Sequence, residues 1–490
     1  MIRRILTMAA LCALVGAVLL AGTAPQAGQP PSTTKGVVIK GNAPVSNDIL
    51  KVKLPRPQEA DLPNGIHLMV LEDHRSPQIV MNIIMEGAGG YYDPTEFPGL
   101  SGFTAAMMLE GTATRTAQQI AQEQETMASG LSVSGGGTGE TAALAVSSLV
   151  DNFDKTLALA ADILFNPSFP EQELARYKAR QKANGVQLRS QPAFLAAERY
   201  GAVMYGSHPS SRVAPTPAEI DKVTREAIVA FHRAHYVPDR AICALVGDIT
   251  LAEARKKIEA VFGSWKKAGV TVPPVAEPAA VGPARVYLID RANSVQSSLV
   301  IGAPAISRTG ADYDVLGLLN AVIGGGPTGR LFLNLREEKG WTYGASSALN
   351  TPRHRGDWSA STEIRGDVTT QAVGEILGEI RRLQSELVPE KEFSDKKRSL
   401  VAGYALSLES PATILSNYIT SRRYNLPADY WDKYPERIMA ITREQVQTAA
   451  KKYLDPARVQ IVAVGDGAKI GESLKKFGTV EVYDTEGRRK

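Results

Sequence analysis

The sequence predicts an α+β protein with two related domains, each an antiparallel sheet backed by helices. One observation is that short apolar strand patterns alternate with segments whose apolar residues recur at spacings of three and four. The other is an internal duplication. Tyr236 and Tyr453 each open a turn, and each turn leads into an apolar strand that ends in Val-Gly-Asp. The two copies lie roughly 217 residues apart, and so long a period indicates a duplicated domain rather than a solenoid.

The N-terminus has the features of a secretory signal peptide. Arg3 and Arg4 precede an apolar run at 5–21, and small residues and prolines follow it. The run is at the short end for a membrane span, and an uncleaved anchor is the alternative. We therefore expect a signal peptide over 1–27 and an exported protein, either periplasmic or secreted.

The rest of the chain divides by composition. A stretch rich in Gly, Pro, Ser and Thr at 28–50 predicts a flexible lead-in. A second proline-rich stretch at 266–284 predicts a linker between domains. We expect an N-terminal domain over 51–265, a C-terminal domain over 285–478 and a tail over 479–490.

The elements follow in chain order from hydrophobic periodicity and turn residues. In the first domain we expect strands at 68–71 and 79–84, a helix at 99–110, a hairpin of 131–134 with 141–147 around a triple-glycine turn, and helices at 154–164, 171–189 and 223–235. In the second we expect strands at 286–289 and 297–301, a helix at 312–323, and a helix at 330–339 that Gly340 ends.

Composition and charge exclude several classes of function. The chain has 490 residues, of which 44% are hydrophobic and 22% charged, with a formal net charge of +4. Loss of Arg3 and Arg4 with the signal peptide leaves a chain too near neutral to predict binding to nucleic acid or to a charged membrane. Cys12 lies in the signal segment, and Cys243 lies in an apolar run typical of a buried strand.

The helix expected at 99–110 carries the most informative motif. Residues 99–112 read Gly-Leu-Ser-Gly-Phe-Thr-Ala-Ala-Met-Met-Leu-Glu-Gly-Thr. This segment resembles the zinc box of the pitrilysin/insulinase family of peptidases, which reads His-x-x-Glu-His. The framing residues are kept, but His, Glu and His are replaced by Gly102, Ala105 and Ala106. These side chains can neither hold zinc nor activate water.

The resemblance also implies a distant carboxylate as a further zinc ligand. No Asp or Glu occurs between Glu173 and Glu198, where the family carries that residue. We therefore expect no metal and no other cofactor in this chain.

A second signature of the family is present. Arg336 and Tyr343 match, in identity and spacing, the pair that holds the substrate. The resemblance implies that the guanidinium and the phenol orient a peptide carbonyl and stabilise the oxyanion that forms on it. By its residues alone, Arg336 among charged neighbours is also typical of a solvated helix face.

A glycine-rich segment precedes this helix, with glycines at 324, 325, 326 and 329. It is not a phosphate-binding loop, because no Gly-Lys-Ser/Thr follows Gly324, Gly325, Gly326 and Gly329 at the required spacing. Two interpretations stay open: a mobile loop whose backbone faces a ligand, as in processing-peptidase relatives, and a plain helix-entry turn.

The six histidines offer no replacement zinc site. His232 and His235 lie three residues apart at the end of a predicted helix, without a nearby carboxylate pattern. We interpret them as charges that cap the C-terminus of that helix. The others, His67, His74, His208 and His354, form no recognisable ligand set.

The resemblance covers residues 50–478 and is closest to short two-domain members such as the subunits of processing peptidases. It implies one half of a clamshell: a zinc-less, non-catalytic subunit that supplies Arg336 and Tyr343 in trans. The expected partner is a homologous chain with an intact His-x-x-Glu-His, which would carry the zinc, and the expected substrate is a peptide or unfolded polypeptide. No nucleic acid and, after signal cleavage, no membrane is expected as a partner. The alternative is a structural or binding scaffold of the same fold with no role in proteolysis.

Overall fold

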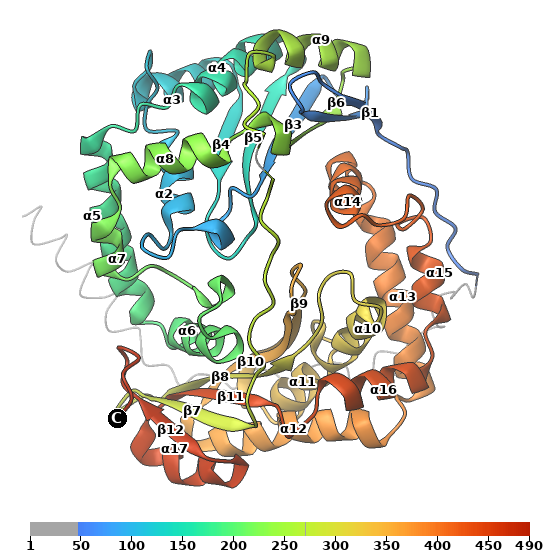
Figure 1. Cartoon of the computed structure of the whole chain (residues 1–490). Helices are drawn as coiled ribbons and strands as arrows, with labels where there is room; N and C mark the ends of the chain where they lie inside the picture. Colours follow the sequence, from blue (N-terminus) through green and yellow to red (C-terminus); the bar gives the residue numbers. More distant parts are fainter. Residues whose placement is uncertain (1–47, 270) are drawn as a thin grey trace, which may run out of the picture. The chain divides into compact units, whose positions relative to one another are not determined.

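The computed structural model describes residues 48–269 and 271–490. The expected signal peptide and nearly all of the lead-in lie outside the described residues. Residues 49–490 form one compact unit that contains two six-stranded sheets, each covered by helices (Figure 1). The α+β class and the presence of two similar halves are confirmed.

The first sheet has the strand order β1-β2-β6-β3-β5-β4. Its strands are β1 (Gln58–Asp61), β2 (His67–Glu72), β3 (Gln78–Glu86), β4 (Gly130–Ser134), β5 (Thr141–Leu149) and β6 (Ala241–Gly247). Every residue of β6 is buried, which explains its continuous apolar sequence. Cys243 lies in this strand, fully buried, and burial raises the pKa of its thiol.

The second sheet repeats this arrangement with the order β12-β7-β11-β8-β10-β9. Its strands are β7 (Arg285–Asp290), β8 (Gln296–Pro304), β9 (Thr342–Asn350), β10 (Asp357–Arg365), β11 (Gln460–Gly465) and β12 (Val480–Tyr483). The expected tail is therefore wrong at 480–483, where alternating valines form an edge strand beside β7. The sheets are also mixed rather than purely antiparallel, because β2–β6, β7–β11 and β7–β12 are parallel pairs.

Helices cover one face of each sheet with a large apolar core. On the first sheet these are α2 (Leu100–Met107), α3 (Ala117–Thr126), α4 (Phe153–Phe165), α5 (Glu171–Arg189), α7 (Pro217–Lys222), α8 (Arg225–His235) and α9 (Leu251–Phe262). On the second they are α10 (Tyr313–Gly324), α11 (Arg330–Phe332), α12 (Thr369–Ser385), α13 (Glu390–Ser407), α15 (Tyr434–Ala440), α16 (Arg443–Tyr453) and α17 (Gly467–Leu474).

The two halves exchange one helix each, which the sequence did not predict. Helix α6 (Pro192–Tyr205) comes from the first half but packs on β8 and β11 of the second sheet. Helix α14 (Pro411–Tyr424) comes from the second half but packs on β6 of the first (Figure 1). The exchange places apolar side chains on the second face of each sheet, so both faces are buried.

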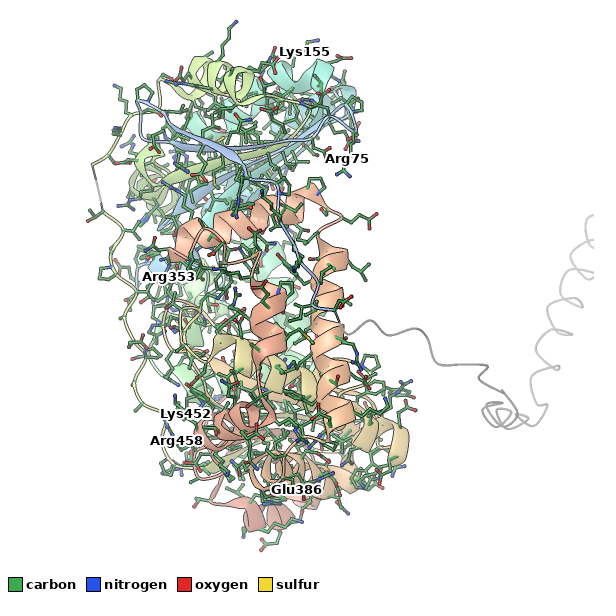
Figure 2. All side chains as sticks on the ribbon, turned by 90° about the vertical axis from the view of Figure 1, so that its right-hand side faces the viewer. Arg75, Lys155, Arg353, Glu386, Lys452 and Arg458 are labelled. Atoms are coloured by element: carbon green, nitrogen blue, oxygen red, sulfur yellow. The ribbon has the colours of Figure 1, made fainter. Side chains whose placement is uncertain are left out.

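Polar contacts fix the exchanged helices. From α6, the hydroxyl of Tyr200 donates to the Asp357 carboxylate at 2.9 Å, and Tyr205 donates to the same carboxylate. Arg353 (Figure 2), in the loop between β9 and β10, pairs with Glu86 and Glu140 of the first half. Because these contacts are buried or half-buried, they bind the two halves into a single body. No helix within residues 48–269 and 271–490 has the length and apolarity needed to span a membrane.

Candidate functional site

The degenerate zinc box lies on α2, where the sequence placed it. Helix α2 ends at Met107, three residues earlier than expected. Ala105 is buried, whereas Gly102 and Ala106 are half-buried. In the described part of the chain, no three His, Cys, Asp or Glu side chains are grouped so that they could hold a metal ion.

The turn between β4 and β5 packs directly against this box. A Cβ atom on Gly136 would come within 2.9 Å of the Cα of Gly102, and a Cβ on Gly135 would come within 3.2 Å of the Cβ of Ala105. The glycines of the turn are therefore required by its close approach to the helix at positions 102 and 105. The turn packs over Gly102 and Ala105 and leaves little space for a large side chain there.

Arg336 lies on a short helix that continues α11. Residues 333–338 form a π-helix, in which the amide of Lys339 donates to the carbonyl of Asn334. Side chains of this segment anchor it to two neighbouring helices: Arg330 pairs with Glu392 of α13, and Asn334 donates to Glu375 of α12. Single π-helical turns occur often at functional sites. Gly340 ends the segment with φ +62°, as expected.

The guanidinium of Arg336 is half-exposed and rests on an aromatic ring. Its Cζ lies 4.7 Å from the centroid of Phe332, and its Nη1 lies 3.2 Å from the Glu337 carboxylate. The stacking on Phe332 orients the guanidinium without burying it, so its N–H groups stay available to an incoming acceptor.

Tyr343 lies on a bulge at the start of β9. Thr342 is opposite Ile364 and Ala345 is opposite Thr362, so two residues of β9 face one residue of β10. The hydroxyl of Thr342 donates across this irregularity. Bulges redirect side chains and occur next to active sites. As a result, Tyr343 is 91% exposed and does not pack into the core.

Tyr343 and Phe332 line a cavity of about 800 Å³ together with the glycine-rich segment. Gly326 and Pro327 border it, and Ala193 and Ala197 of the exchanged helix α6 form another part of its wall. The volume is in the range of ligand-binding pockets. The lining contains none of the three positions of the degenerate zinc box, so the structure does not join that box and Tyr343 in this cavity.

The glycine-rich segment is a tight turn whose tip borders this cavity. A Cβ on Gly329 would meet the Cα of Gly324 at 2.9 Å, and one on Gly324 would meet the amide nitrogen of Ser347 at 2.4 Å. Gly326 has φ +85°, a conformation that favours glycine. Close backbone packing thus explains these glycines as parts of a helix-entry turn, while Gly325 and Gly326 at the tip are exposed.

The interpretation of His232 and His235 as capping charges is wrong. The ring of His232 is half-buried beside α4, where its Nε2–H donates to the carbonyl of Leu164 at 2.9 Å. Burial lowers the pKa of His232 to about 4 and also lowers that of His235. Both rings are neutral at pH 7, because burial disfavours the charged form more than the helix C-terminus favours it.

The sequence missed Phe332 as the support of Arg336 and α6 as a wall of the cavity. A signal for Phe332 was present, since it lies four residues before Arg336 and so on the same side of a helix. No local signal marks α6, because its placement depends on the second sheet.

Comparison with known proteins gives the family. A family model described as "Insulinase (Peptidase family M16)" matches residues 68–209, and one described as "Peptidase M16 inactive domain" matches 222–400. An uncharacterised zinc protease of Rickettsia bellii is 24% identical over 82% of this chain and 96% of its own length. One of Bacillus subtilis is 24% identical over 72% of this chain and 85% of its own.

Solved structures give the same family and fold. The peptidase M16 inactive domain of Pseudomonas fluorescens is 27% identical, covers 84% of this chain and 98% of its own, and has a TM-score of 0.77. A protease from Helicobacter pylori shares the fold, with a TM-score of 0.78 at 16% identity over 84% of this chain and 100% of its own. Together with the framing residues of the zinc box, these matches show that the chain is a member of the insulinase family, peptidase family M16, of the type without zinc ligands.

Proposed function

We propose that this chain is the zinc-less subunit of a heterodimeric insulinase-type metallopeptidase and supplies Arg336 and Tyr343 in trans. The observation that carries the proposal is the contrast between two sites. The zinc box has no donor atoms, yet Tyr343 is displayed on a bulge beside a cavity whose wall supports Arg336. Exposed groups of this kind fit a role at a site that a second chain completes.

The chemistry follows from the two side chains. Hydrolysis of a peptide bond builds negative charge on the carbonyl oxygen, and zinc held by the partner would supply the activated water. A guanidinium and a phenol that donate hydrogen bonds to this oxygen stabilise the transition state. The partner would be a homologous chain with an intact His-x-x-Glu-His that binds zinc, and the substrate a peptide or unfolded polypeptide. We place the complex outside the cytoplasm, in the periplasm or secreted, on the strength of the N-terminal sequence.

The test is peptidase activity on a quenched, unstructured peptide. We expect the chain alone to be inactive and a mixture with an exported zinc-bearing relative to be active. Loss of one oxyanion donor typically costs about 10²–10³ in kcat, so Arg336→Ala and Tyr343→Phe should each lower the rate of the mixture by that factor. Arg365→Ala, an exposed arginine on β10 of the same sheet, is the matched control and should leave the rate unchanged.

A scaffold without a role in proteolysis is the second candidate, and the closed turn over Gly102 and Ala105 favours it. It predicts a different result in the same assay. The mixture would be active, but Arg336→Ala and Tyr343→Phe would behave like the Arg365→Ala control. Activity of the lone chain that a chelator abolishes would contradict both candidates.

A further inference from the structure

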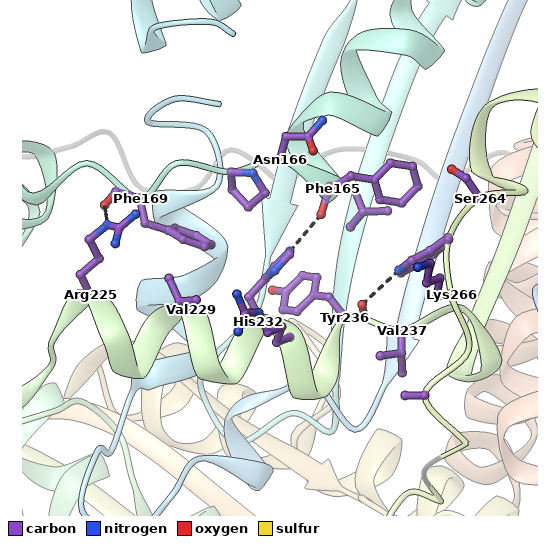
Figure 3. Close-up of a pocket in the computed structure, with 15 residues that line it drawn as sticks. Phe165, Asn166, Phe169, Arg225, Val229, His232, Tyr236, Val237, Ser264 and Lys266 are labelled. Atoms are coloured by element: carbon purple, nitrogen blue, oxygen red, sulfur yellow. Dashed lines mark hydrogen bonds between the residues drawn. The ribbon is translucent and has the colours of Figure 1, made fainter. Parts of the chain in front are cut away.

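A second cavity, of about 760 Å³, lies within the first half of the molecule (Figure 3). Helix α8, the end of α4 and the segment after α9 border it. Its lining includes neither the degenerate zinc box nor any residue of the second half. It is therefore separate from the site assigned above, and its chemistry can be considered independently.

Aromatic side chains make up much of its wall. Phe165 and Trp265 pack together with ring centroids 5.7 Å apart, and the Phe169 and His232 rings are 5.6 Å apart. Tyr236 stacks on His232 at 5.0 Å. Aromatic walls of this kind bind flat or branched apolar groups.

The charges around the cavity have one sign. Its lining contains Arg225, Arg233 and Lys266 and no Asp or Glu. The guanidinium of Arg225 is held in place, because its Nε and Nη2 donate to the carbonyls of Phe169 and Ser168, both at 3.0 Å. Arg233 and Lys266 are exposed and form no ion pair with any residue in the described part of the chain. An anion at this opening would find unpaired cations.

Two polar groups of the wall also lack partners. His232 donates from Nε2 to Leu164, so its Nδ1 is an acceptor, and no residue of the described chain donates to it. The Tyr236 hydroxyl is buried without a hydrogen-bond partner among those residues. In Figure 3 this hydroxyl points along the cavity toward the side where Phe169 lies. The described part of the chain therefore leaves both groups without a partner, although the Tyr236 hydroxyl itself is closed off from solvent.

We propose that this cavity binds an apolar carboxylate. The apolar group would lie along the aromatic wall between Phe169 and Trp265. The carboxylate would lie at the opening, where Arg233 and Lys266 supply donors. A cation is disfavoured by the three basic side chains, and a purely apolar ligand would leave them unused. The same chemistry occurs in the C-terminal residue of a peptide and in a free aromatic or aliphatic acid.

The test is calorimetric titration of the full-length protein with three probes: a pentapeptide ending in phenylalanine, the same peptide as its C-terminal amide, and 3-phenylpropionate. We expect saturable binding of the peptide acid and at least tenfold weaker binding of the amide. Binding of 3-phenylpropionate as tight as that of the peptide acid would assign the site to a free acid. Equal binding of acid and amide, or no saturable binding of either acid, would overturn the proposal.

Surface variants locate the binding without disturbing the fold. The double variant Arg233→Gln, Lys266→Gln should weaken binding of the acid about tenfold or more, because it removes both free cations at the opening. Lys267→Gln is the matched control, since Lys267 is exposed and adjacent but does not line the cavity. An unchanged affinity in the double variant would refute the assigned position. Arg336→Ala should leave binding intact, which keeps this test independent of the proposed peptidase role.

Discussion

His232 shows how burial decides the chemistry of a single residue. Its pKa is lowered from 6.5 to about 4, first of all by desolvation. Between these values the unfolded chain binds a proton that the folded chain does not. The contribution of neutral His232 to the free energy of unfolding is therefore complete above pH 6.5. It is lost as the pH falls toward 4. His208, His235 and His354 have pKa values lowered by burial as well and act in the same direction.

When the pH is lowered from 7.5 to 5, we expect His232 alone to reduce the free energy of unfolding by about 2 kcal/mol. Urea unfolding at the two pH values measures this loss. In His232→Gln the difference between the two pH values should shrink by that amount, whatever the variant does to stability at pH 7.5. An identical pH dependence in variant and wild type would show that the buried ring does not titrate as described.

Glycines at the ends and in the middle of α10 have opposite roles. A Cβ on Gly324 would lie 2.4 Å from the amide nitrogen of Ser347, whereas one on Gly317 would meet no atom within 4 Å. We expect Gly324→Ala to destabilise the protein by about 1–3 kcal/mol through overpacking. Gly317→Ala, the same change on the same helix, should stabilise it by about 0.5–1 kcal/mol. Equal unfolding midpoints in denaturant would contradict this difference.

At the scale of elements, α2 and the hairpin of β4 and β5 have adapted to each other. The small side chains at 102 and 105 match the glycines of the turn, so the helix is kept for packing rather than for metal binding. Arg336 and Tyr343, in contrast, are kept exposed by the elements that carry them. The bulge in β9 directs Tyr343 away from the sheet, and the anchors on α12 and α13 fix the helix of Arg336.

Restoring the motif should therefore not restore the metal. We expect the triple variant Gly102→His, Ala105→Glu, Ala106→His to bind no stoichiometric zinc and to melt at a lower temperature. The larger side chains at 102 and 105 meet the turn at Gly135 and Gly136, and the window at 174–197 supplies no carboxylate. Metal analysis and thermal unfolding measure both effects. Gly102→Ala, whose Cβ would be 3.7 Å from Gly136, is the control and should melt normally; one zinc per chain in the triple variant would contradict the prediction.

At the scale of the whole molecule, the exchange of α6 and α14 couples the two halves. Each helix completes the second apolar face of the other half's sheet, so neither half buries both faces of its sheet alone. The buried Asp357 receives hydroxyl groups from both Tyr200 and Tyr205. The halves of the duplication are thus not independent domains joined by a linker, although their sequences are continuous on either side of it.

Cutting the linker tests this coupling. We expect a protein with a protease site inserted between Pro274 and Val275, once cleaved, to elute as one particle and to separate only in denaturant. The cleaved and uncleaved forms should each unfold in a single transition. Separation of the fragments in native buffer would show that the exchanged helices do not hold the halves together.

The sequence alone determined the α+β class, the duplication and the absence of zinc ligands. These features depend on local periodicity and on which side chains carry donor atoms, and both can be read from neighbouring residues. It also located Arg336 on a helix that Gly340 ends. Only the tertiary structure decided which sheet α6 and α14 cover, that His232 is neutral, and that the glycine turn closes over the degenerate box. Each of these depends on surfaces that meet from segments far apart in the chain, and burial between such surfaces leaves no periodic signal in either one.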